Sequence, residues 1–169
     1  MFAQSKGEFV VIMDSDLSHH PKFIPKFVEA QKSDDYDIVS GSRYSLLPRS
    51  FKFAKKLVEN GGVYGWNLKR KCFSTIANIF AKVLLGTRSS DLTGSFRLYR
   101  RKTFSDLLKN VKSLNFNFQM EIMARAEHSN FKIKEVPITF VDRIYGHSKL
   151  GIGEIVNYIK KVIELSVID

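Results

Sequence analysis

The sequence of 169 residues has little cysteine and only short apolar runs. Cys72 is the only cysteine, which excludes an intrachain disulfide and a cysteine cluster for zinc and fits a reducing compartment. The adjacent His19 and His20 point apart, which argues against a metal site built on two histidines. No apolar segment approaches the roughly 20 residues that a membrane-spanning helix needs, so we expect any membrane role to be peripheral or to depend on a partner.

Acidic residues are also scarce, with 17 Asp and Glu against 27 Lys and Arg and a net charge of +10. Between Arg43 and Lys71 there are eight basic residues and a single acid, Glu59. This excess predicts an anionic partner such as a nucleotide, a lipid phosphate, a membrane surface or a nucleic acid, although a solvated basic face would have the same composition. The 44% of apolar residues and the length favour one globular domain over residues 1–169.

The most informative stretch is an apolar run, Phe9 to Met13, that ends in Asp14-Ser15-Asp16. A continuous run this short predicts a strand buried on both faces of a parallel sheet. The two acids would then follow its carboxyl end, where open α/β sheets place their ligands. Residues i and i+2 of an extended segment point the same way, so both carboxylates could hold Mg²⁺ or Mn²⁺. Turn-forming or helix-capping aspartates explain the same spacing.

The rest of the pattern predicts an α/β fold in which a sheet is flanked by helices. The strand at 37–43 leads through a glycine turn to Arg43, which we expect at the same sheet edge as the two aspartates, suited to phosphate. A strand at 131–141 contains Pro137, which predicts an edge or a bulge. The apolar stripe of the 67–85 helix is expected in the core; it consists of Phe73, Ile76, Ala77, Phe80, Val83 and Leu84. The other expected elements are helices at 21–32, 102–111 and 118–128, a strand ending at residue 100, and a last helix from 152 that docks on the domain.

Five segments, taken in order, closely resemble the dolichyl-phosphate mannosyltransferases, which are inverting family-2 glycosyltransferases with the GT-A fold. The resemblance runs from Gly7 to about Leu165. It implies a Rossmann-like GT-A sheet and transfer of mannose from GDP-mannose to dolichyl phosphate, giving dolichyl phosphate mannose for N-glycosylation, O-mannosylation and GPI-anchor synthesis. The segments are Val11 to Pro21, Val39 to Tyr44, Gly61 to Trp66, Asp91 to Arg97 and Val141 to Lys149.

The resemblance also implies roles for individual residues. Asp14 and Asp16, on either side of Ser15, would hold Mg²⁺ or Mn²⁺ against the diphosphate of the donor. Asp16, Arg43 and Arg143 would act in catalysis. The phosphates would be bound by Arg43, Arg143 and Lys149. Residues expected to shape the sugar and acceptor pocket are Asp91, Gly94, Arg97, Gln119, Glu121 and Ser148.

Two departures from the family pattern add further expectations. Family members carry opening β-α units before the acid motif, and this sequence begins a few residues before it. We therefore expect exposed strand edges, an incomplete GDP pocket, and a fragment or short gene model that is unstable or inactive alone. Residues 45–60 are expected to form a basic insertion loop. The resemblance further implies small membrane subunits as partners and a peripheral location on the cytosolic face of the endoplasmic reticulum.

Other functions fit parts of the pattern. A dolichyl-phosphate glucosyltransferase or another polyprenyl-phosphate glycosyltransferase differs only in the donor or acceptor. An aspartate-nucleophile phosphatase also has Asp-x-Asp after a strand, but it needs a later acidic pair, and no such pair follows Glu135. A basic module for anionic lipid or nucleic acid would use Arg43 to Lys71, but it lacks a stacking platform, and nucleic acid is not expected.

Overall fold

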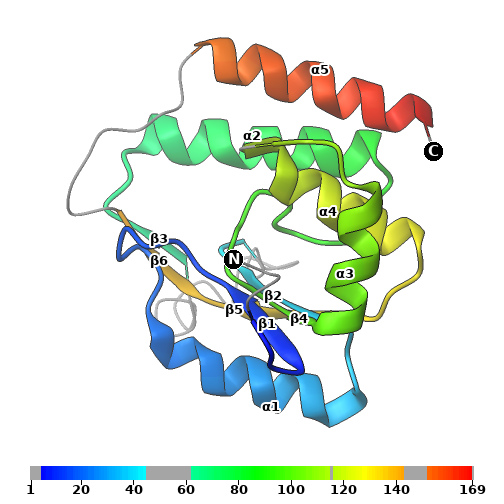
Figure 1. Cartoon of the computed structure of the whole chain (residues 1–169). Coiled ribbons are helices and arrows are strands. Elements are labelled where there is room, and N and C mark those ends of the chain that lie inside the picture. Colours follow the sequence, from blue (N-terminus) through cyan, green and yellow to red (C-terminus); the bar gives the residue numbers. More distant parts are fainter. Residues whose placement is uncertain (1–4, 45–61, 115, 143–151, 169) are drawn as a thin grey trace.

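The computed structural model describes residues 5–44, 62–114, 116–142 and 152–168 and shows a mixed α/β architecture (Figure 1). A four-stranded sheet has the order β1-β4-β2-β5, and a two-stranded sheet pairs β3 with β6. The strands are β1 (Phe9–Ile12), β2 (Ile38–Ser42), β3 (Gly62–Tyr64), β4 (Arg97–Arg100), β5 (Ile133–Pro137) and β6 (Thr139–Val141). The helices are η2 (Pro21–Phe23), α1 (Ile24–Asp34), α2 (Leu68–Leu84), α3 (Arg101–Asn110), α4 (Phe116–His128) and α5 (Ile152–Ile168).

Strand direction brings several loops to one edge of the larger sheet. β4 is antiparallel to both β1 and β2, and β2 is parallel to β5. It follows that β1, β2 and β5 share one direction, so their carboxyl ends lie at the same edge as the amino end of β4. The segments after β1 and β2 and before β4 therefore meet there, as the sequence predicted for Asp14, Asp16 and Arg43.

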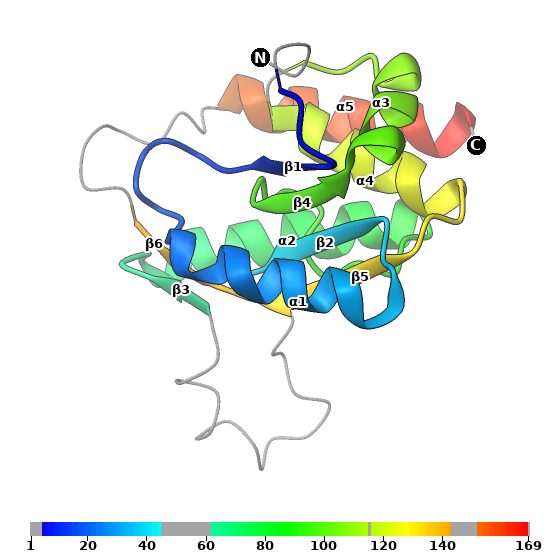
Figure 2. The ribbon, with the colours of Figure 1, turned by 60° about the horizontal axis from the view of Figure 1, so that its bottom comes forward.

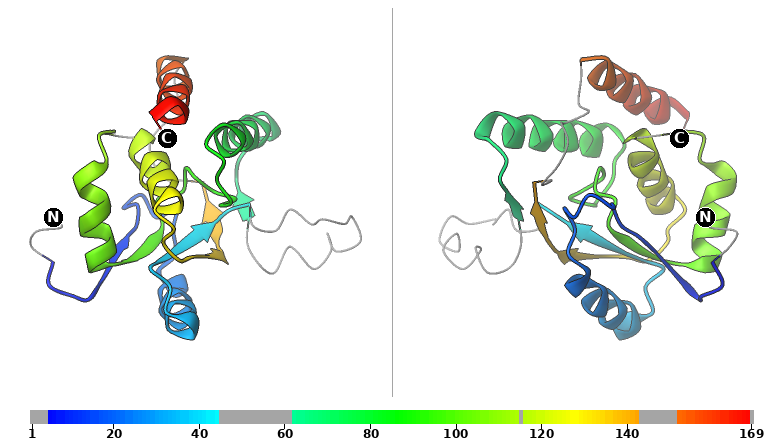
Figure 3. Two further views of the ribbon diagram at one scale, coloured as in Figure 1. Left: turned by 90° about the vertical axis from the view of Figure 1, so that its right-hand side faces the viewer. Right: turned by 60° about the vertical axis from the view of Figure 1, so that its left-hand side comes forward.

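Each face of the sheet is covered by a separate apolar cluster, because successive side chains of a strand point to opposite faces. On one face, Val39 of β2 packs with Phe27 of α1. On the other, Ile38 belongs to the cluster formed with α2, α3, α4 and α5. Figure 2 shows α1 alone on its side of the sheet, and Figure 3 shows α2 and α5 on the opposite side.

The prediction for β1 was wrong in part. β1 follows the predicted residues, but among the described strands it pairs only with β4, antiparallel, and lies at the edge of the sheet. Val11 is 37% exposed, so the strand is not buried on both faces. An apolar run shows that a segment avoids water, but it does not show in which direction the neighbouring strands run.

The strand predicted at 131–141 is two strands in different sheets. β5 ends at Pro137 and β6 begins at Thr139, paired with β3. The edge position that Pro137 predicted is confirmed, because β5 is the last strand of its sheet. Since proline cannot donate to a strand ladder, it ends the pairing of β5 where the chain crosses to the smaller sheet.

The core position predicted for the α2 stripe was also wrong in part. Ile76 and Val83 are 64% and 75% exposed, whereas Ala81 and Asn78 are buried. The helix thus packs through the side next to the predicted stripe. The docking predicted for the last helix is confirmed by Val162 and Leu165, which lie in the core. No helix in the described ranges combines the length and apolar character required to cross a bilayer.

Candidate functional site

The candidate site lies where the segments after β1 and β2 meet the loop before β4. Asp14 and Ser15 are exposed and Asp16 is half-buried. The Oδ1 of Asp16 accepts a hydrogen bond from the Ser18 amide at 3.1 Å, so Asp16 also forms the turn that the sequence allowed as its other role. The Asp14 side chain is therefore open to solvent, whereas Asp16 is partly covered.

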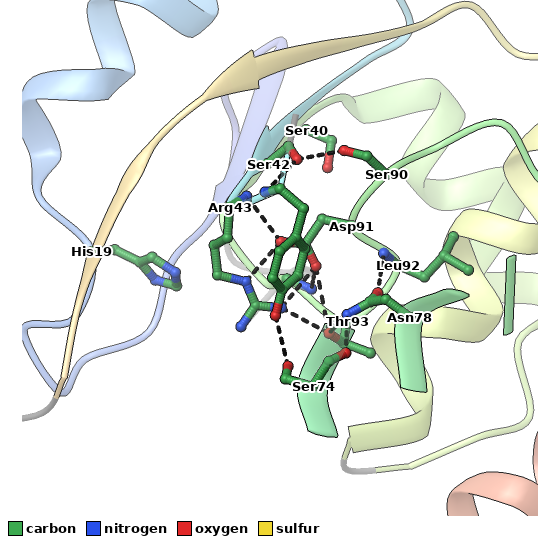
Figure 4. Close-up of polar contacts among 12 residues, drawn as sticks. His19, Ser40, Ser42, Arg43, Ser74, Asn78, Ser90, Asp91, Leu92 and Thr93 are labelled. Carbon is green, nitrogen blue, oxygen red and sulfur yellow. Dashed lines mark hydrogen bonds and ion pairs between the residues drawn. The ribbon is translucent and has the colours of Figure 1, made fainter. Parts of the chain in front are cut away.

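Arg43 forms a buried, two-pronged ion pair with Asp91, a residue 48 positions later in the chain (Figure 4). Its Nε and Nη2 each donate to one carboxylate oxygen at 2.7 Å, and its backbone N–H donates to Oδ2 at 3.1 Å. Nη2 also donates to Thr93 at 2.7 Å. Within the described ranges, Nη1 makes no hydrogen bond. The carboxylate therefore fixes the guanidinium while one nitrogen stays available for a phosphate oxygen.

Each charge of this pair favours the ionised form of the other group. Burial alone would raise the pKa of Asp91, but the charge and hydrogen bonds of Arg43, helped by Arg97, hold that pKa below its usual value. Burial would likewise lower the pKa of Arg43, but Asp91 raises it above its usual value, with a smaller contribution from Asp14. Both groups stay ionised, and Asp14 lies close enough to Arg43 for their charges to interact.

The loop that carries Asp91 is fixed by hydrogen bonds from several elements. Glu135 of β5 accepts the Ser90 amide at 2.8 Å, and the Gly94 amide donates to Oδ1 of Asp91 at 2.9 Å. A Cβ at Gly94 would lie 3.1 Å from Oδ2 of Asp91, so a larger residue would press on the carboxylate. Asn78 of α2 accepts the Leu92 amide at 3.0 Å. Gly94 therefore supports Asp91 from within the loop.

Arg97 and Gln119 lie beneath this loop. Arg97 is fully buried at the start of β4. Its Nη2 donates to the Leu92 carbonyl at 2.9 Å, and its Nη1 donates to the Gln119 carbonyl at 2.8 Å and side-chain oxygen at 3.1 Å. The structure thus brings Arg97 and Gln119 together, and they join the Asp91 loop to α4.

Glu121 lies apart from these residues, in a contact between helices. Its carboxylate accepts the amides of Lys112 and Ser113 at 3.1 and 2.8 Å and Nε of Arg125 at 2.8 Å, and it lies 3.6 Å from Nζ of Lys161 on α5. Burial opposes ionisation, but these hydrogen bonds lower the pKa of Glu121 to about 2. The contacts with Lys112, Ser113 and Lys161 join α4 to its neighbours, and the contact with Arg125 lies within the helix.

His19 supports the acid loop. Its Nδ1 accepts the Asp14 amide at 3.3 Å and lies 3.8 Å from Oδ2 of Asp14. The ring packs at a tilt against Phe96 and edge-on against Phe140, with centroids 5.1 Å away in each case. Burial, with the charge of Arg43, lowers the pKa of His19 although Asp14 and other acids raise it. A neutral imidazole is consistent with its role as acceptor.

A second arginine lies near the smaller sheet. Arg70, in the first turn of α2, donates to both oxygens of Asp142 at 3.0 and 3.1 Å. Its guanidinium lies 4.1 Å from the centre of the Trp66 ring, and the Arg43 guanidinium lies 5.9 Å from the same ring. Gly65 has φ +86 and a Cβ there would lie 2.9 Å from Asp142, so this turn requires glycine. Trp66 therefore lies close to both guanidinium groups.

Some predicted site residues lie outside the described ranges, and some residues found at the site were not predicted. Arg143, Ser148 and Lys149 fall in the first group, as does the insertion expected at 45–60. His19, Trp66 and Arg70 belong to the second group. The positions of Trp66 and His19 inside the motifs were the only sequence signal for them, since their contacts join distant segments.

No cluster of three or more His, Cys, Asp or Glu side chains suited to a metal is found in the described parts of the chain. Asp14 and Asp16 supply two carboxylates, fewer than such a cluster contains. It suits Mg²⁺ or Mn²⁺, because these ions often bind through one or two carboxylates while phosphates and waters complete the shell.

Comparison with known proteins identifies the family. The family model described as glycosyl transferase family 2 matches residues 1–108. The chain is 32% identical over 147 residues to an undecaprenyl-phosphate mannosyltransferase of Micrococcus luteus, covering 86% of this chain and 54% of that protein. It is 33% identical over 156 residues to a polyprenol monophosphomannose synthase of Mycolicibacterium smegmatis, covering 92% and 54%. The chain spans about half the length of these curated relatives. With its α/β sheet and its ordered motifs, the chain belongs to glycosyl transferase family 2 and has a fold consistent with GT-A.

Proposed function

We propose that this chain belongs to a transferase that moves mannose from GDP-mannose to a polyprenyl phosphate, with dolichyl phosphate as the acceptor. The observation that carries the proposal is the fixed guanidinium of Arg43 at the sheet edge where Asp14 and Asp16 also lie. The names of the two relatives, a mannosyltransferase for undecaprenyl phosphate and a synthase for polyprenol monophosphomannose, support the same substrate class.

The chemistry that this assigns to the site is a single displacement. An oxygen of the lipid phosphate attacks C1 of the sugar, the bond between C1 and the diphosphate oxygen breaks, and the configuration at C1 is inverted. The acceptor is already an anion at neutral pH, so it needs no general base. Two anions must approach each other, and negative charge grows on the leaving diphosphate. Cationic groups held in place by the fold lower the free energy of the approach of the two anions and of the charge on the leaving diphosphate.

Arg43 is suited to stabilising these phosphates because the fold already holds its guanidinium in place. Asp91 and Thr93 hold Nε and Nη2, which leaves Nη1 to bind phosphate. Arg70 offers a second guanidinium near Trp66, and its partner Asp142 is only partly buried. A phosphate that binds both arginines would lie beside the indole ring. Arg143, Ser148 and Lys149 remain proposed phosphate contacts on the basis of the family resemblance.

Asp14 and Asp16 are proposed to hold Mg²⁺ or Mn²⁺, which would neutralise the diphosphate of the donor. The hydrogen bond from the Asp14 amide to His19 keeps the first acid in place, and the Asp16 contact with Ser18 fixes the following turn. The family resemblance extends the proposal to small membrane subunits as partners and to the endoplasmic reticulum as location.

The test is transfer of radiolabelled mannose from GDP-mannose to dolichyl, undecaprenyl or short-chain prenyl phosphate, with and without Mn²⁺, measured as label extracted into organic solvent. UDP-glucose as donor tests the glucosyltransferase alternative. Because the chain spans about half the length of these relatives, prenyl-phosphate binding by the chain is measured in parallel. Binding that is lost in Arg43→Gln while the variant remains folded by circular dichroism supports the acceptor site even without turnover. Absence of both binding and turnover in the folded chain would contradict the proposal.

A further inference from the structure

Asn78 is a buried amide in the interior of α2, 4% exposed, where the helix faces the loop before β4 (Figure 4). Its Oδ1 accepts the Leu92 amide at 3.0 Å. Its Nδ2 donates to the Ser74 carbonyl at 3.1 Å and to Oγ1 of Thr93 at 3.2 Å. Asparagine is less favourable than alanine or leucine inside a helix, and burial of an amide is unfavourable unless it is hydrogen-bonded. The contacts with the loop, and not the helix itself, therefore explain an amide at this position.

The neighbours of Asn78 determine which side of its amide is the oxygen. The Leu92 N–H only donates and the Ser74 carbonyl only accepts, so Oδ1 faces the loop backbone and Nδ2 faces the helix carbonyl. One Nδ2 hydrogen points to Ser74, which leaves the other for Thr93. Asn78 is therefore a donor toward the Thr93 hydroxyl.

The Thr93 hydroxyl lies between Asn78 and the guanidinium of Arg43. A hydroxyl offers one hydrogen and two lone pairs. Nη2 of Arg43, at 2.7 Å, and Nδ2 of Asn78 are both donors, so they occupy the lone pairs. The hydroxyl hydrogen is left for the acceptor nearby, Oδ1 of Asp91, at 3.4 Å. The hydrogen bond from Asn78 thus keeps the other lone pair of Thr93 turned toward Arg43.

The contact with Thr93 restricts the Arg43 guanidinium. Asp91 accepts the Nε hydrogen and one Nη2 hydrogen, and Thr93 accepts the second Nη2 hydrogen. The guanidinium plane is therefore held by two residues of the loop, and rotation of Nη2 would break a hydrogen bond to each of them. Nη1 is the nitrogen that this arrangement leaves for a ligand.

The same side of α2 supports Arg43 by a second route. Ser74 lies four residues before Asn78 and therefore on the same face of the helix. Its hydroxyl forms a hydrogen bond with the Tyr44 hydroxyl at 2.7 Å, and the Tyr44 ring centre lies 5.3 Å from Cζ of Arg43. The helix thus reaches Arg43 through Thr93 and through Tyr44, although Arg43 itself follows β2.

We propose that Asn78 is a positioning residue, which donates to the Thr93 hydroxyl and thereby holds the Arg43 guanidinium in the orientation that presents Nη1 to a phosphate. The identity of that phosphate as a prenyl phosphate rests on the proposed function, whereas the orientation of Arg43 does not. If Asn78 served the fold alone, it would tie α2 to the loop through Leu92, and its loss would change stability without changing Arg43.

Substitutions at the two residues test this route. Asn78→Ala removes the donor to Thr93, and Thr93→Val keeps the shape of the side chain but removes the acceptor for Arg43. Thr93→Ser keeps the hydroxyl and should restore the behaviour of the parent chain. Val28→Ala is the control for a general loss of stability, because Val28 packs in the cluster on the other face of the sheet. Urea denaturation followed by circular dichroism shows that each variant is folded.

The orientation of Arg43 is measurable without a ligand. In a chain with isotope-labelled arginine, the Nη hydrogens of a held guanidinium give separate NMR signals that exchange slowly with water. Arg43→Lys identifies the signals that belong to Arg43. We expect separate signals in the parent chain, Thr93→Ser and Val28→Ala. Asn78→Ala and Thr93→Val should lose them, because rotation about the bond between Cζ and Nη2 becomes faster.

Binding of a water-soluble short-chain prenyl phosphate, measured by calorimetry, tests the consequence for the proposed function. Loss of one neutral hydrogen bond should weaken binding about three- to tenfold in Asn78→Ala and in Thr93→Val. Because Asn78 acts through Thr93, the double variant should bind no more weakly than Thr93→Val alone. Val28→Ala should bind as the parent chain does.

Two results would overturn the proposal. One is an unchanged set of Arg43 signals in folded Asn78→Ala. The other is a pair of affinity losses that add in the double variant, because Asn78 would then act by a route that does not include Thr93. If the parent chain binds no prenyl phosphate while the Arg43 signals change as expected, the proposed function fails and the positioning of Arg43 by Asn78 is supported.

Discussion

At the scale of single residues, the site depends on charges that the fold keeps ionised. Arg43 and Asp91 are both almost fully buried, with side-chain exposures of 8% and 0%, and each is stable only because the other is present. An isolated buried charge is costly, whereas the pair satisfies most of its hydrogen bonds locally. The ion pair therefore serves the fold and the proposed phosphate contact through the same guanidinium.

Asp91→Asn should lower the free energy of unfolding by about 3–5 kcal/mol, because it leaves the buried Arg43 charge uncompensated. Asp35→Asn is the control: Asp35 pairs with Arg100 but is 81% exposed, so a loss of at most about 1 kcal/mol is expected. Urea denaturation measures both. Similar small losses for Asp91→Asn and Asp35→Asn would contradict this account.

His19→Phe tests how the acid loop is held. The phenyl ring can keep the ring contacts with Phe96 and Phe140, but it cannot accept a hydrogen bond from the Asp14 amide. We expect a loss of about 1 kcal/mol in stability and weaker binding of Mn²⁺, measured by the paramagnetic signal of the free ion. His20→Phe is the matched control, since His20 is exposed and its Nδ1 caps the Lys22 amide instead. Unchanged Mn²⁺ binding in His19→Phe would show that the contact is dispensable.

At the scale of elements, the helices are joined by polar contacts as well as by the core. Glu121 of α4 accepts from the 112–113 backbone and from Arg125 and faces Lys161 of α5. Its pKa falls from 4.5 to about 2 on folding. A group whose pKa is lowered in the folded state contributes stability above its unfolded pKa and loses it as the pH falls toward the folded pKa.

We therefore expect the free energy of unfolding to fall between about pH 5 and pH 2, by at most about 3 kcal/mol from Glu121 alone. Glu121→Gln should flatten that dependence. Glu164→Gln is the control, because Glu164 also contacts Lys161 but its side chain is 53% exposed. Denaturation followed by circular dichroism at several pH values measures the slope. A slope that is unchanged in Glu121→Gln would assign the acid sensitivity to other carboxylates.

The positions of the helices and strands were largely predictable from the sequence, whereas which elements pack or pair with one another was not. A continuous apolar run located β1, and apolar periodicity located α2 and α5, within a few residues, because apolar patterns report which side chains avoid water. It could not show that Ile76 and Val83 face outward, since a stripe looks the same whether protein or lipid covers it. The crossing from β5 to β6 at Ile138 depends on pairing with a distant strand, β3.

The candidate site was also predictable only in part, because the sequence indicates strand ends but not contacts between distant segments. Strand ends and residue types placed Asp14, Asp16 and Arg43 at one sheet edge, which the topology confirms. The contact between Arg43 and Asp91 joins residues 48 positions apart, and no local sequence pattern indicates it. Arg70 was considered only as part of a basic cluster, because its pairing with Asp142, 72 residues later, exists only in the folded chain.

At the scale of the whole molecule, the site joins segments that are distant in sequence and belong to both sheets. The acid loop follows β1, Arg43 follows β2, and Trp66 and Arg70 follow β3. A ligand that contacts several of them binds only the folded chain, so it should raise the stability of the whole molecule by linkage. Pyrophosphate with Mn²⁺ is a suitable probe, because it represents the diphosphate of a sugar nucleotide and requires no base pocket.

At 100 times its dissociation constant, such a ligand stabilises the folded state by about 2.7 kcal/mol, which corresponds to a rise in Tm of roughly 5–10 °C for a domain of this size. The rise should require Mn²⁺ and pyrophosphate together and should be abolished by EDTA. It should also be lost in Asp14→Asn with Asp16→Asn, whose exposed or half-buried side chains contribute little to the core. Glu29→Gln with Asp34→Asn, on α1, removes the same formal charge away from the site and should retain the rise. An equal rise in both double variants would show that the two carboxylates after β1 do not hold the ion, since only general charge effects would then remain.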